Sequence, residues 1–289
     1  MSDIRHIKEK QATIKRIRKI TYAMQVVAET RLARIKKKAV EIKNYHNKLR
    51  LILSDVIARS TEEYHPLMEI RKTVKTVGVI MVNSDEGMCG GFNNNVFNRV
   101  RDFIKRHGGK KFKFISFGRK SERFLRGVEK DSVIKRFSGI AAENRHTIAE
   151  EASDEIINLF LTGALDEVYI IYNEYRINIL GRASELKILP VEPVLHKVKE
   201  KTVSDYLYEP SASELLSALL PEYVLELIFY SLVESRAAEE LARQLAMKNA
   251  TDNADEIMKK LSFAYHRARQ AVITNEIAEI VNAAQSVTG

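Results

Sequence analysis

The two ends of this 289-residue sequence lack the residues that interrupt helices. Neither glycine nor proline occurs before Pro66 or between Glu222 and Thr288, and 11 of the 12 glycines lie between residues 78 and 181. Because both residue types disfavour the interior of a helix, each end can form one very long helix, and the turns belong in the middle. We therefore divide the chain into an N-terminal helical segment (1–65), a central domain (66–210) and a C-terminal helical segment (211–289).

Cysteine and long apolar runs are also scarce. The single cysteine, Cys89, excludes an internal disulfide framework and a paired-thiol redox switch, which fits a reducing compartment. No run of about 18 uncharged apolar residues occurs, so we expect no direct membrane span. The seven histidines have no recurrent metal-ligand spacing, and no Ser-His-Asp or Cys-His set is evident. We therefore expect no catalytic residue, no metal and no cofactor.

Basic residues are concentrated at the N-terminus. Residues 1–50 contain 15 Lys or Arg and 4 Asp or Glu, a net charge of +11, whereas the whole chain carries +9. This asymmetry predicts an acidic partner for the N-terminal segment, which could be nucleic acid, anionic lipid or an acidic protein surface. Composition alone does not choose among these partners.

The first residues are basic and amphipathic, like a mitochondrial transit peptide. However, Asp3 and Glu9 lie within them, and the same pattern continues past residue 50. We therefore interpret the N-terminus as part of the mature protein. Because an organellar precursor would normally carry an extra leader, we expect a bacterial cytoplasmic protein.

Apolar residues recur at a strict spacing of seven through the N-terminal segment. This spacing is typical of a coiled coil, and a continuous helix over it would reach roughly 80 Å. Arg31 and Lys38 are charged interruptions of the seam. The first seam position comprises Ile7, Ile14, Thr21, Ala28, Ile35, Ile42, Leu49 and Val56, and part of the second comprises Ile17, Met24, Tyr45 and Ile52.

The C-terminal segment has apolar residues at alternating steps of three and four. From Ser213 to the end, a helix would span about 110 Å. Four polar residues break the seam, so we expect a shift of register or a different partner there. Two such helices joined through a globular middle most simply pack antiparallel, giving a rod that projects from a body. The apolar blocks are Leu220, Val224 and Leu227, then Ile257, Leu261, Ala264, Ala268 and Ala271, then Ile277, Ile280, Ala284 and Val287; the breaks are Ser231, Glu234, Lys248 and Asp252.

The middle of the chain alternates between strand-like and helix-like patterns. Runs rich in β-branched and aromatic residues predict strands, and the segments between them have helical spacing. This alternation favours a small sheet with helices on its faces. The predicted fold class is therefore α/β: a long antiparallel coiled coil of the terminal helices plus a central Rossmann-like α/β domain. The predicted strands are 74–82, 112–117 and 168–175, and the predicted helices are 93–107, 119–126 and 143–161.

Several stretches match the motifs of one known family, in the family's order. Near the start, RKITYAM at 18–24 and VVA at 26–28 are similar to a KITKAM…VAA helix, and SDEGMCGGFN at 84–93 is similar to an SDRGLCGGxN loop. Later, DYLYEP at 205–210, AMKNATDNA at 246–254, and RARQAVITNEI at 267–277 with EIV at 279–281 are similar to YxYEP, AMxxATxNA and RARQAxITxEI.EIV. Through these motifs the sequence resembles the gamma subunit of F-type ATP synthases.

The resemblance implies a non-catalytic rotor shaft. In this family the coiled coil inserts into a hexamer of alternating alpha and beta subunits, which hold the nucleotides, while the foot stands on the membrane c-ring. Rotation of the shaft couples ion flow through that ring to ATP synthesis or hydrolysis at the beta subunits. The resemblance also implies contact with the epsilon subunit and a peripheral position on the cytoplasmic face of the bacterial cell membrane.

The resemblance also assigns contacts to particular residues. Arg269, Gln270 and Thr274 match positions that hydrogen-bond to a loop of the beta subunit, and their spacing puts Gln270 and Thr274 on one helical face, one turn apart. Isolated polar residues of this kind are usually exposed without a specific role. Tyr208 and Glu209 are candidates for contact with the polar loops of the membrane ring. The helix that bears on the hexamer would include Lys19, Thr21, Met24, Ile277 and Ile280.

The glycines of segment 84–93 follow a strand and precede a helix, as in a phosphate-binding loop. They lack the G-x-G-x-x-G spacing and the G-K-[ST] ending, so we interpret the segment as a tight turn that docks the sheet against the coiled coil. The sequence also departs from the family motifs: Tyr22 replaces the second lysine of KITKAM, Glu86 replaces the arginine of SDRG, and NAAQ at 282–285 replaces GGAA. Because Glu86 reverses a charge, we do not transfer the family arginine's contact.

Two hypotheses from other classes remain. A nucleotide-dependent enzyme using the α/β domain would require phosphate binding by the isolated chain. A nucleic-acid or scaffold hairpin would require steeply salt-dependent binding to a polyanion. The N-terminal basic residues are not interleaved with an aromatic stacking platform, and no base-reading motif appears, so we expect no nucleic-acid partner. Both hypotheses leave the C-terminal motif unexplained.

Overall fold

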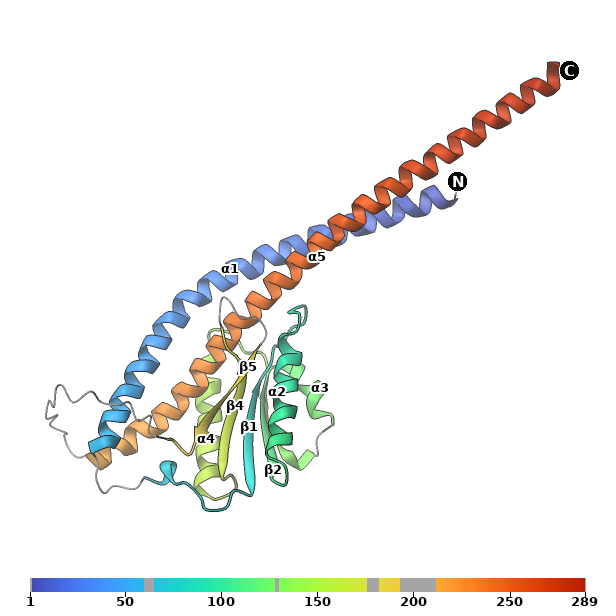
Figure 1. Ribbon diagram of the computed structural model, residues 1–289. Coiled ribbons are helices and arrows are strands. Elements are labelled where there is room, and N and C mark those ends of the chain that lie inside the picture. The colour runs from blue at the N-terminus through green and yellow to red at the C-terminus, as the bar shows by residue number, and fades with distance from the viewer. Residues whose placement is uncertain (1, 60–64, 128–129, 176–181, 193–211, 289) are drawn as a thin grey trace. The chain divides into compact units, whose positions relative to one another are not determined.

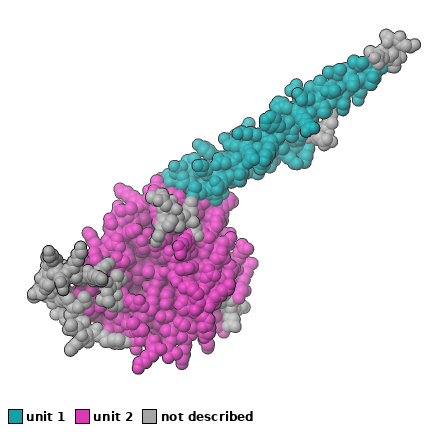
Figure 2. Space-filling view, in the orientation of Figure 1, with its two compact units in different colours: residues 1–30, 243–289 teal, residues 31–242 magenta. Residues whose placement is uncertain are grey.

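The computed structural model of the chain describes residues 2–59, 65–127, 130–175, 182–192 and 212–288. The chain forms two compact units, which Figure 2 colours separately. The coiled-coil unit comprises residues 1–30 and 243–289, and the sheet unit comprises residues 31–242. Both terminal helices contribute to both units.

Each terminal segment forms one long helix (Figure 1). α1 runs from Ser2 to Arg59 and has 58 residues, and α5 runs from Ala212 to Thr288 and has 77 residues. Pro221 lies inside α5, near its start, where it removes one backbone hydrogen bond. These bounds confirm the two long helices predicted from the absence of helix breakers.

Burial along α1 identifies the face that packs on α5. Every position of the seven-residue series from Ile7 to Val56 is buried or half-buried, as predicted. The predicted second seam is wrong at three of its four positions: Ile17, Tyr45 and Ile52 are 43, 50 and 51% exposed, whereas Met24 is half-buried. The residues three and four positions after a member of the first seam lie on opposite sides of it. Periodicity alone therefore does not show which of the two belongs to the second seam. The buried second positions lie four residues after the first, at Leu32, His46 and Leu53.

The sheet unit contains a five-stranded sheet with the strand order β3-β2-β1-β4-β5. Strands β1 to β4 are parallel, and β5 pairs antiparallel with β4. The predicted alternation of strands and helices is confirmed. The sequence pattern does not predict β3 and β5, because these edge strands are largely half-buried and carry charged residues. The strands are β1 (Thr76–Val82), β2 (Lys111–Phe117), β3 (Val133–Phe137), β4 (Glu167–Asn173) and β5 (Ala183–Leu189).

Helices cover both faces of the sheet: α2 and α3 pack on one face, and α4 and α5 pack on the other. Alternate residues of β1 point to opposite faces of the sheet, because side chains along a strand alternate in direction. Val79 and Met81 pack toward α2, and Ile80 and Val82 pack toward α4 and α5. The helices are α2 (Phe92–Arg106), α3 (Glu122–Leu125) and α4 (Arg145–Leu161), with short 3-10 helices η1 (Pro66–Met68), η2 (Arg119–Ser121) and η3 (Lys130–Ser132).

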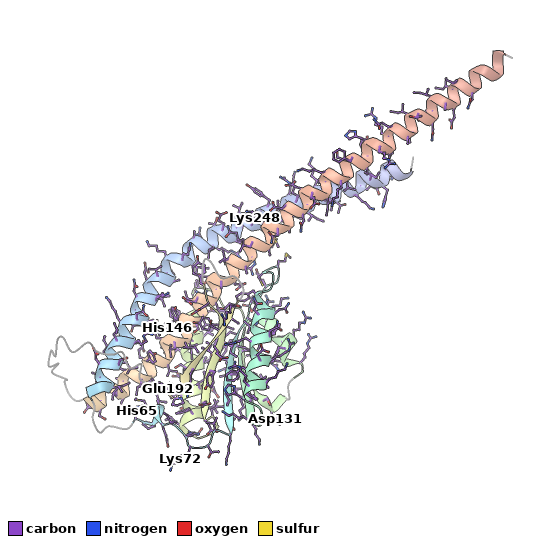
Figure 3. The ribbon with its side chains drawn as sticks, in the orientation of Figure 1. His65, Lys72, Asp131, His146, Glu192 and Lys248 are labelled. Atoms are coloured by element: carbon purple, nitrogen blue, oxygen red, sulfur yellow. The ribbon has the colours of Figure 1, made fainter. Side chains whose placement is uncertain are left out.

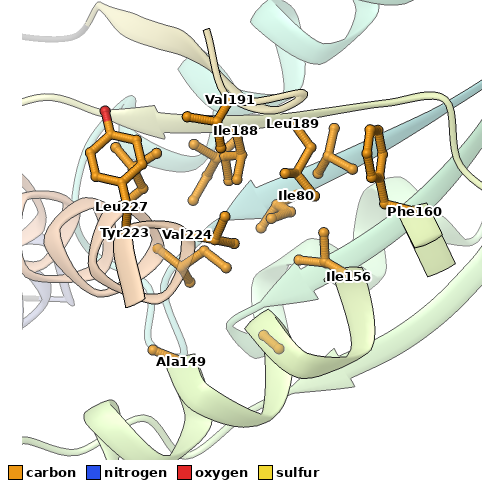
Figure 4. Packing of buried hydrophobic residues seen from close by; sticks show 14 of the residues in the cluster. Ile80, Ala149, Ile156, Phe160, Ile188, Leu189, Val191, Tyr223, Val224 and Leu227 are labelled. Carbon is orange, nitrogen blue, oxygen red and sulfur yellow. The ribbon is translucent and has the colours of Figure 1, made fainter. Parts of the chain in front are cut away.

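The first part of α5 is a core element of the sheet unit. Val224 and Leu227 belong to the same buried cluster as Ala149 of α4 and Ile80 of β1 (Figure 4). Among the described residues, one stretch, 213–282 of α5, is long and apolar enough to cross a membrane by length and composition. Its apolar window is 56% buried inside the structure. A buried core helix passes the same test, so the finding is weak evidence for a span.

An aromatic stack joins α1 to α5 within the sheet unit. The His46 ring stacks on the rings of Tyr223 and Tyr230, with centroids 5.9 and 4.9 Å apart. Burial, and then the charge of Arg50, lower the pKa of His46 to about 4. The ring is therefore neutral at pH 7 and packs as an apolar residue at a seam position.

Glu226 places a carboxyl group in the same part of α5, where it is 6% exposed. Burial, and then repulsion from Glu222, raise the pKa of Glu226 from 4.5 to about 7. In the unfolded chain this group ionises near its ordinary pKa, whereas in the folded chain it stays protonated until about pH 7. The group therefore opposes folding increasingly as the pH rises through this window.

We predict that Glu226→Gln stabilises the full chain at pH 8 by about 2 kcal/mol, with allowance for solvent screening, and has little effect at pH 4. The amide cannot ionise, so it removes the cost of keeping a carboxyl protonated. Urea denaturation followed by circular dichroism at both pH values measures the difference. Glu150→Gln, at an exposed position of α4, is the matched control. Equal effects of Glu226→Gln at both pH values would contradict the raised pKa.

Candidate functional site

Polar contacts join the two helices of the coiled-coil unit. The hydroxyl oxygens of Thr21 on α1 and Thr251 on α5 lie 2.8 Å apart, within hydrogen-bonding distance. The ammonium nitrogen of Lys8 lies 5.6 Å from the centre of the Tyr265 ring. Residue numbers fall along α1 as they rise along α5, which confirms the predicted antiparallel packing.

The three residues predicted to contact a beta-subunit loop all lie on α5 in this unit. Arg269, Gln270 and Thr274 are exposed, and Gln270 and Thr274 are one helical turn apart. Within the part of the chain that the structure describes, none of their side chains forms a hydrogen bond or an ion pair. They are therefore accessible to a partner.

The predicted bearing residues fall into two separate groups. Thr21 and Met24 are half-buried on α1 and Lys19 is exposed, whereas Ile277 and Ile280 on α5 are 56 and 68% exposed. Thr21 lies opposite residue 251, so Ile277 is 277 − 251 = 26 residues further along α5, about 39 Å at the rise of an α-helix. The structure does not bring the two groups together. The predicted ring contacts, at positions 208 and 209, lie outside the described residues.

Large apolar side chains remain exposed on the coiled-coil unit, drawn in teal in Figure 2. Phe263 on α5 is 78% exposed, and Ile20 and Tyr22 on α1 are 59 and 56% exposed. An accumulation of such side chains indicates an interaction surface rather than a solvated one. Further exposed members are Ile17, Val26, Val27, Ile257, Ile273, Ile277, Ile280 and Val281.

In the sheet unit, segment 84–93 forms a turn after β1 that is centred on Asn93. The side-chain oxygen of Asn93 accepts hydrogen bonds from the backbone N–H of Ser84 at 3.0 Å and from the Asn83 amide at 3.2 Å. Its own amide donates to Ser84 Oγ at 2.8 Å. Ser84 Oγ donates in turn to the carbonyl oxygen of Glu86 at 2.6 Å. The start of α2 is thereby fixed to the end of β1.

Asp85 connects this turn to two other loops. Its Oδ1 accepts from the backbone N–H of Arg119 at 3.0 Å, and its Oδ2 accepts from that of Ile140 at 3.1 Å. Gly118, next to Arg119, has a φ of 87°, and a Cβ on it would lie 2.2 Å from the carbonyl oxygen of Asn83. Glycine alone permits both the conformation and the close approach.

The apolar side of the turn packs on α5. Cys89 and Phe92 are 2 and 3% exposed and form a cluster with Ala238 of α5. Met88 and Gly90, on either side of Cys89, have positive φ values of 60° and 56°, the left-handed conformation found in tight turns. The predicted tight turn is confirmed, but it docks the sheet on the part of α5 that lies in the sheet unit, not on the coiled-coil unit as predicted.

Sequence reasoning assigned no individual role to the residues that hold this turn. Asp85 and Asn93 lie inside the family-like motif at 84–93, and this motif was the only sequence feature that could have indicated their importance. Gly118 lies outside every motif, and its signal was only a glycine directly after the predicted strand 112–117. The bonds of all three residues join segments that are distant in sequence, so no local pattern reveals them.

Comparison with known proteins extends over the whole chain. A family model described as ATP synthase matches residues 3–287. ATP synthase gamma chains of Desulfitobacterium hafniense and Geotalea daltonii are 35 and 36% identical to this chain over 287 and 291 residues. The alignments cover 99 and 100% of this chain and 100% of each relative. The chain belongs to the ATP synthase gamma chain family.

Solved structures agree with this gamma chain fold. A chain of the Euglena gracilis mitochondrial ATP synthase (OSCP/F1/c-ring, rotational state 3) aligns with a TM-score of 0.65 at 19% identity, covering 99% of this chain and 95% of that one. A chain of the Tetrahymena thermophila central stalk and c-ring aligns with a TM-score of 0.58 at 20% identity, covering 80% and 99%. At these identities the likeness concerns the fold.

The turn at 84–93 suggests a test of what holds this gamma chain together. We predict that Gly118→Ala lowers the free energy of unfolding by about 3 kcal/mol, because it adds a clash with backbone to the strain of a positive φ. Gly109→Ala is the matched control: Gly109 has the same φ of 87°, and a Cβ on it would meet nothing within 4 Å. Its expected cost is about 1 kcal/mol. Equal losses of stability in denaturation would contradict the close approach at Asn83.

Proposed function

We infer that this chain is the central rotor shaft of an F-type ATP synthase, a non-catalytic subunit. The full-length match to gamma chains carries the inference. The structure supports it with two long helices that pack antiparallel and keep many large apolar side chains exposed. In this function, ion flow through the membrane ring is coupled to ATP synthesis or hydrolysis at the beta subunits.

The coupling follows from a mismatch of symmetry. The shaft is asymmetric, whereas the surrounding alpha and beta subunits repeat three times around it. Each orientation of the shaft therefore makes different contacts with each beta subunit and favours a different conformation of each nucleotide site. By linkage, occupancy of those sites favours particular orientations of the shaft. Through these contacts, rotation of the shaft drives the nucleotide reaction at the beta subunits, and the reaction in turn drives rotation.

Two surfaces of the coiled-coil unit fit this function. The exposed polar side chains of Arg269, Gln270 and Thr274 would bind a beta-subunit loop as a catch. The exposed apolar side chains of Ile277 and Ile280 would bear against the top of the hexamer. Support comes from their accessibility and from the motif that contains them.

The basic N-terminal segment fits a carboxylate-rich sleeve of beta-subunit loops. Residues 1–50 carry a net charge of +11, and Lys19 projects from α1 at an exposed position. Attraction between opposite charges on solvated surfaces is weak and is screened by salt, so it permits sliding. Thr21 and Met24 would support the same surface from the half-buried seam.

The remaining contacts rest on the resemblance alone. We propose that Tyr208 and Glu209 contact the polar loops of the c-ring and that the epsilon subunit binds the same end of the complex. The complex would then hold this chain at the cytoplasmic face of a bacterial cell membrane. A peripheral subunit of this kind needs no membrane span of its own.

Coexpression with the alpha and beta subunits of the same operon tests the shaft and the catch together. We expect a 3:3:1 complex that hydrolyses ATP, and we expect the double change Arg269→Ala and Gln270→Ala to lower turnover about tenfold, equivalent to about 1.4 kcal/mol. The loss would arise because the loop no longer has hydrogen-bond partners on α5. Steady-state ATP hydrolysis by the purified complexes measures it.

The matched control removes another pair of polar side chains from the same unit. Glu256 and Lys260 form an exposed ion pair at 2.8 Å, and changing both to alanine should leave turnover unchanged. Normal turnover of the Arg269 and Gln270 double variant would reject the catch while preserving the shaft. Failure of the chain to copurify or support turnover would reject the shaft, and the basic helices should then be tested against nucleic acid.

A further inference from the structure

A cavity of about 340 Å³ lies within the sheet unit, between α1, α5 and the loop before α4. Its size falls in the range of small-molecule sites. Five cationic side chains from three elements line it, and no carboxylate is among its described lining residues. These cations are Arg31, Arg34 and Lys38 of α1, Arg145 of α4 and Arg236 of α5.

Arg145 differs from the other cations because it is buried. It is the first residue of α4 and is only 8% exposed. Burial, and then the charge of Arg236, lower the pKa of Arg145. Among the described residues, no hydrogen bond or ion pair reaches its guanidinium group. A buried cation without a partner is costly, and an anion bound beside it would remove that cost.

Two carboxylates near the cavity pair with its other cations. Arg236 pairs with Glu239 at 2.7 Å and with Glu240 at 2.8 Å. Arg31 lies 3.8 Å from Glu240. Glu239, and then the exposed Glu143, attract Arg145 and partly offset the effect of its burial. The ion pairs of Glu239 and Glu240 therefore offset mainly Arg236 and Arg31.

The start of α4 adds positive potential at the same place. α4 has 17 residues, and its N-cap Asn144 makes no side-chain capping bond, because its oxygen accepts from the N–H of Ala141 at 2.8 Å. The first N–H groups of such a helix carry partial positive charge. His146, the second residue of α4 and labelled in Figure 3, packs edge-on against Phe229 of α5, with ring centres 5.4 Å apart. Ala141 and Arg145 line the cavity.

The rest of the cavity is largely apolar. Two helices and the loop supply a wall of branched and aromatic side chains, which suits the body of an organic ligand better than a hydrated inorganic ion. A cavity of this volume holds a few side chains or one small molecule, but not a helix about 10 Å across. The apolar lining residues are Ile35, Ile42, Ile140, Ala141, Ala142, Phe229 and Val233.

We propose that this cavity binds a small organic phosphate. The phosphate lies at Arg145, Arg34 and Lys38, where its oxygens accept hydrogen bonds from the cations and from the start of α4. The apolar body of the ligand lies against Phe229 and Val233. A phosphate dianion suits this site better than a single carboxylate, because none of these three cations has an ion pair among the described residues.

Phenyl phosphate is the simplest probe, because it joins the dianion to a ring. Isothermal titration of the full chain should show saturable binding with a Kd of about 0.1 mM, at least about tenfold tighter than inorganic phosphate or phenol alone. Arg145→Gln should weaken this binding about tenfold and Arg34→Gln several-fold. Phe229→Ala should weaken binding of phenyl phosphate but not of inorganic phosphate.

The matched control is Arg123→Gln on α3, which removes an exposed cation from the opposite face of the sheet and should leave binding unchanged. Circular dichroism of each variant separates loss of binding from loss of folding. Because Arg34 is exposed, its variant keeps the test decisive if Arg145→Gln does not fold. The titration uses this chain alone, so its outcome is independent of the rotor function.

Three results would overturn the proposal. The first is no saturable binding of phenyl phosphate below about 10 mM. The second is an equal loss in Arg123→Gln and Arg145→Gln, which would show nonspecific attraction to a basic chain. The third is binding of a hexaglutamate peptide without binding of phenyl phosphate, which would assign the cavity to an acidic protein partner.

Discussion

The burial of α5 within the sheet unit is the constraint on which the rest of the structure depends. Leu220 and Val224 are fully buried against α4 and the sheet, in the place of an ordinary covering helix. The same helix continues into the coiled-coil unit, where Thr251 meets Thr21. A shift of α5 by one turn would therefore break the core of one unit and the polar contacts of the other, so its register is fixed twice.

Between these regions α5 has no single apolar seam, because it is enclosed on several sides. Ser231 is fully buried and donates to the carbonyl oxygen of Leu227 at 2.8 Å, and Glu234 accepts from the Tyr230 hydroxyl at 2.6 Å. These bonds satisfy Ser231 and one carboxylate oxygen of Glu234, which lowers the cost of burying both polar groups. The break in the seam at Ser231 and Glu234 therefore reflects a change of packing partner, as the sequence suggested. One new partner is the turn at 84–93, which packs on Ala238.

The features that could be predicted from sequence are those with a local cause. Missing helix breakers define α1 and α5, and apolar runs define the central strands. The edge strands β3 and β5 could not be predicted, because half-exposed strands carry both apolar and charged side chains. The second seam of α1 escapes it because only the position of α5 distinguishes Leu53 from Ile52. At the candidate site, the docking role of the turn was predictable, whereas the Asn93 and Gly118 contacts depend on distant segments. The roles of Arg269 and Gln270 depend on another chain and stay predictions.

The turn at 84–93 does not depend on the charge of Glu86. Only the backbone carbonyl of Glu86 enters the hydrogen bonds that hold the turn, and its side chain is exposed. An arginine at this position, as in the family motif, could make the same backbone bonds, so the fold does not decide between the two charges. Met88, 64% exposed, lies beside it. Because the side chain of Glu86 is exposed, reversing its charge changes the surface of the turn without changing the backbone bond that helps to hold it. The exposed charge at Glu86 is therefore not constrained by the fold of the turn, whereas Ser84 and Cys89 are buried and Asn93 is hydrogen-bonded within it.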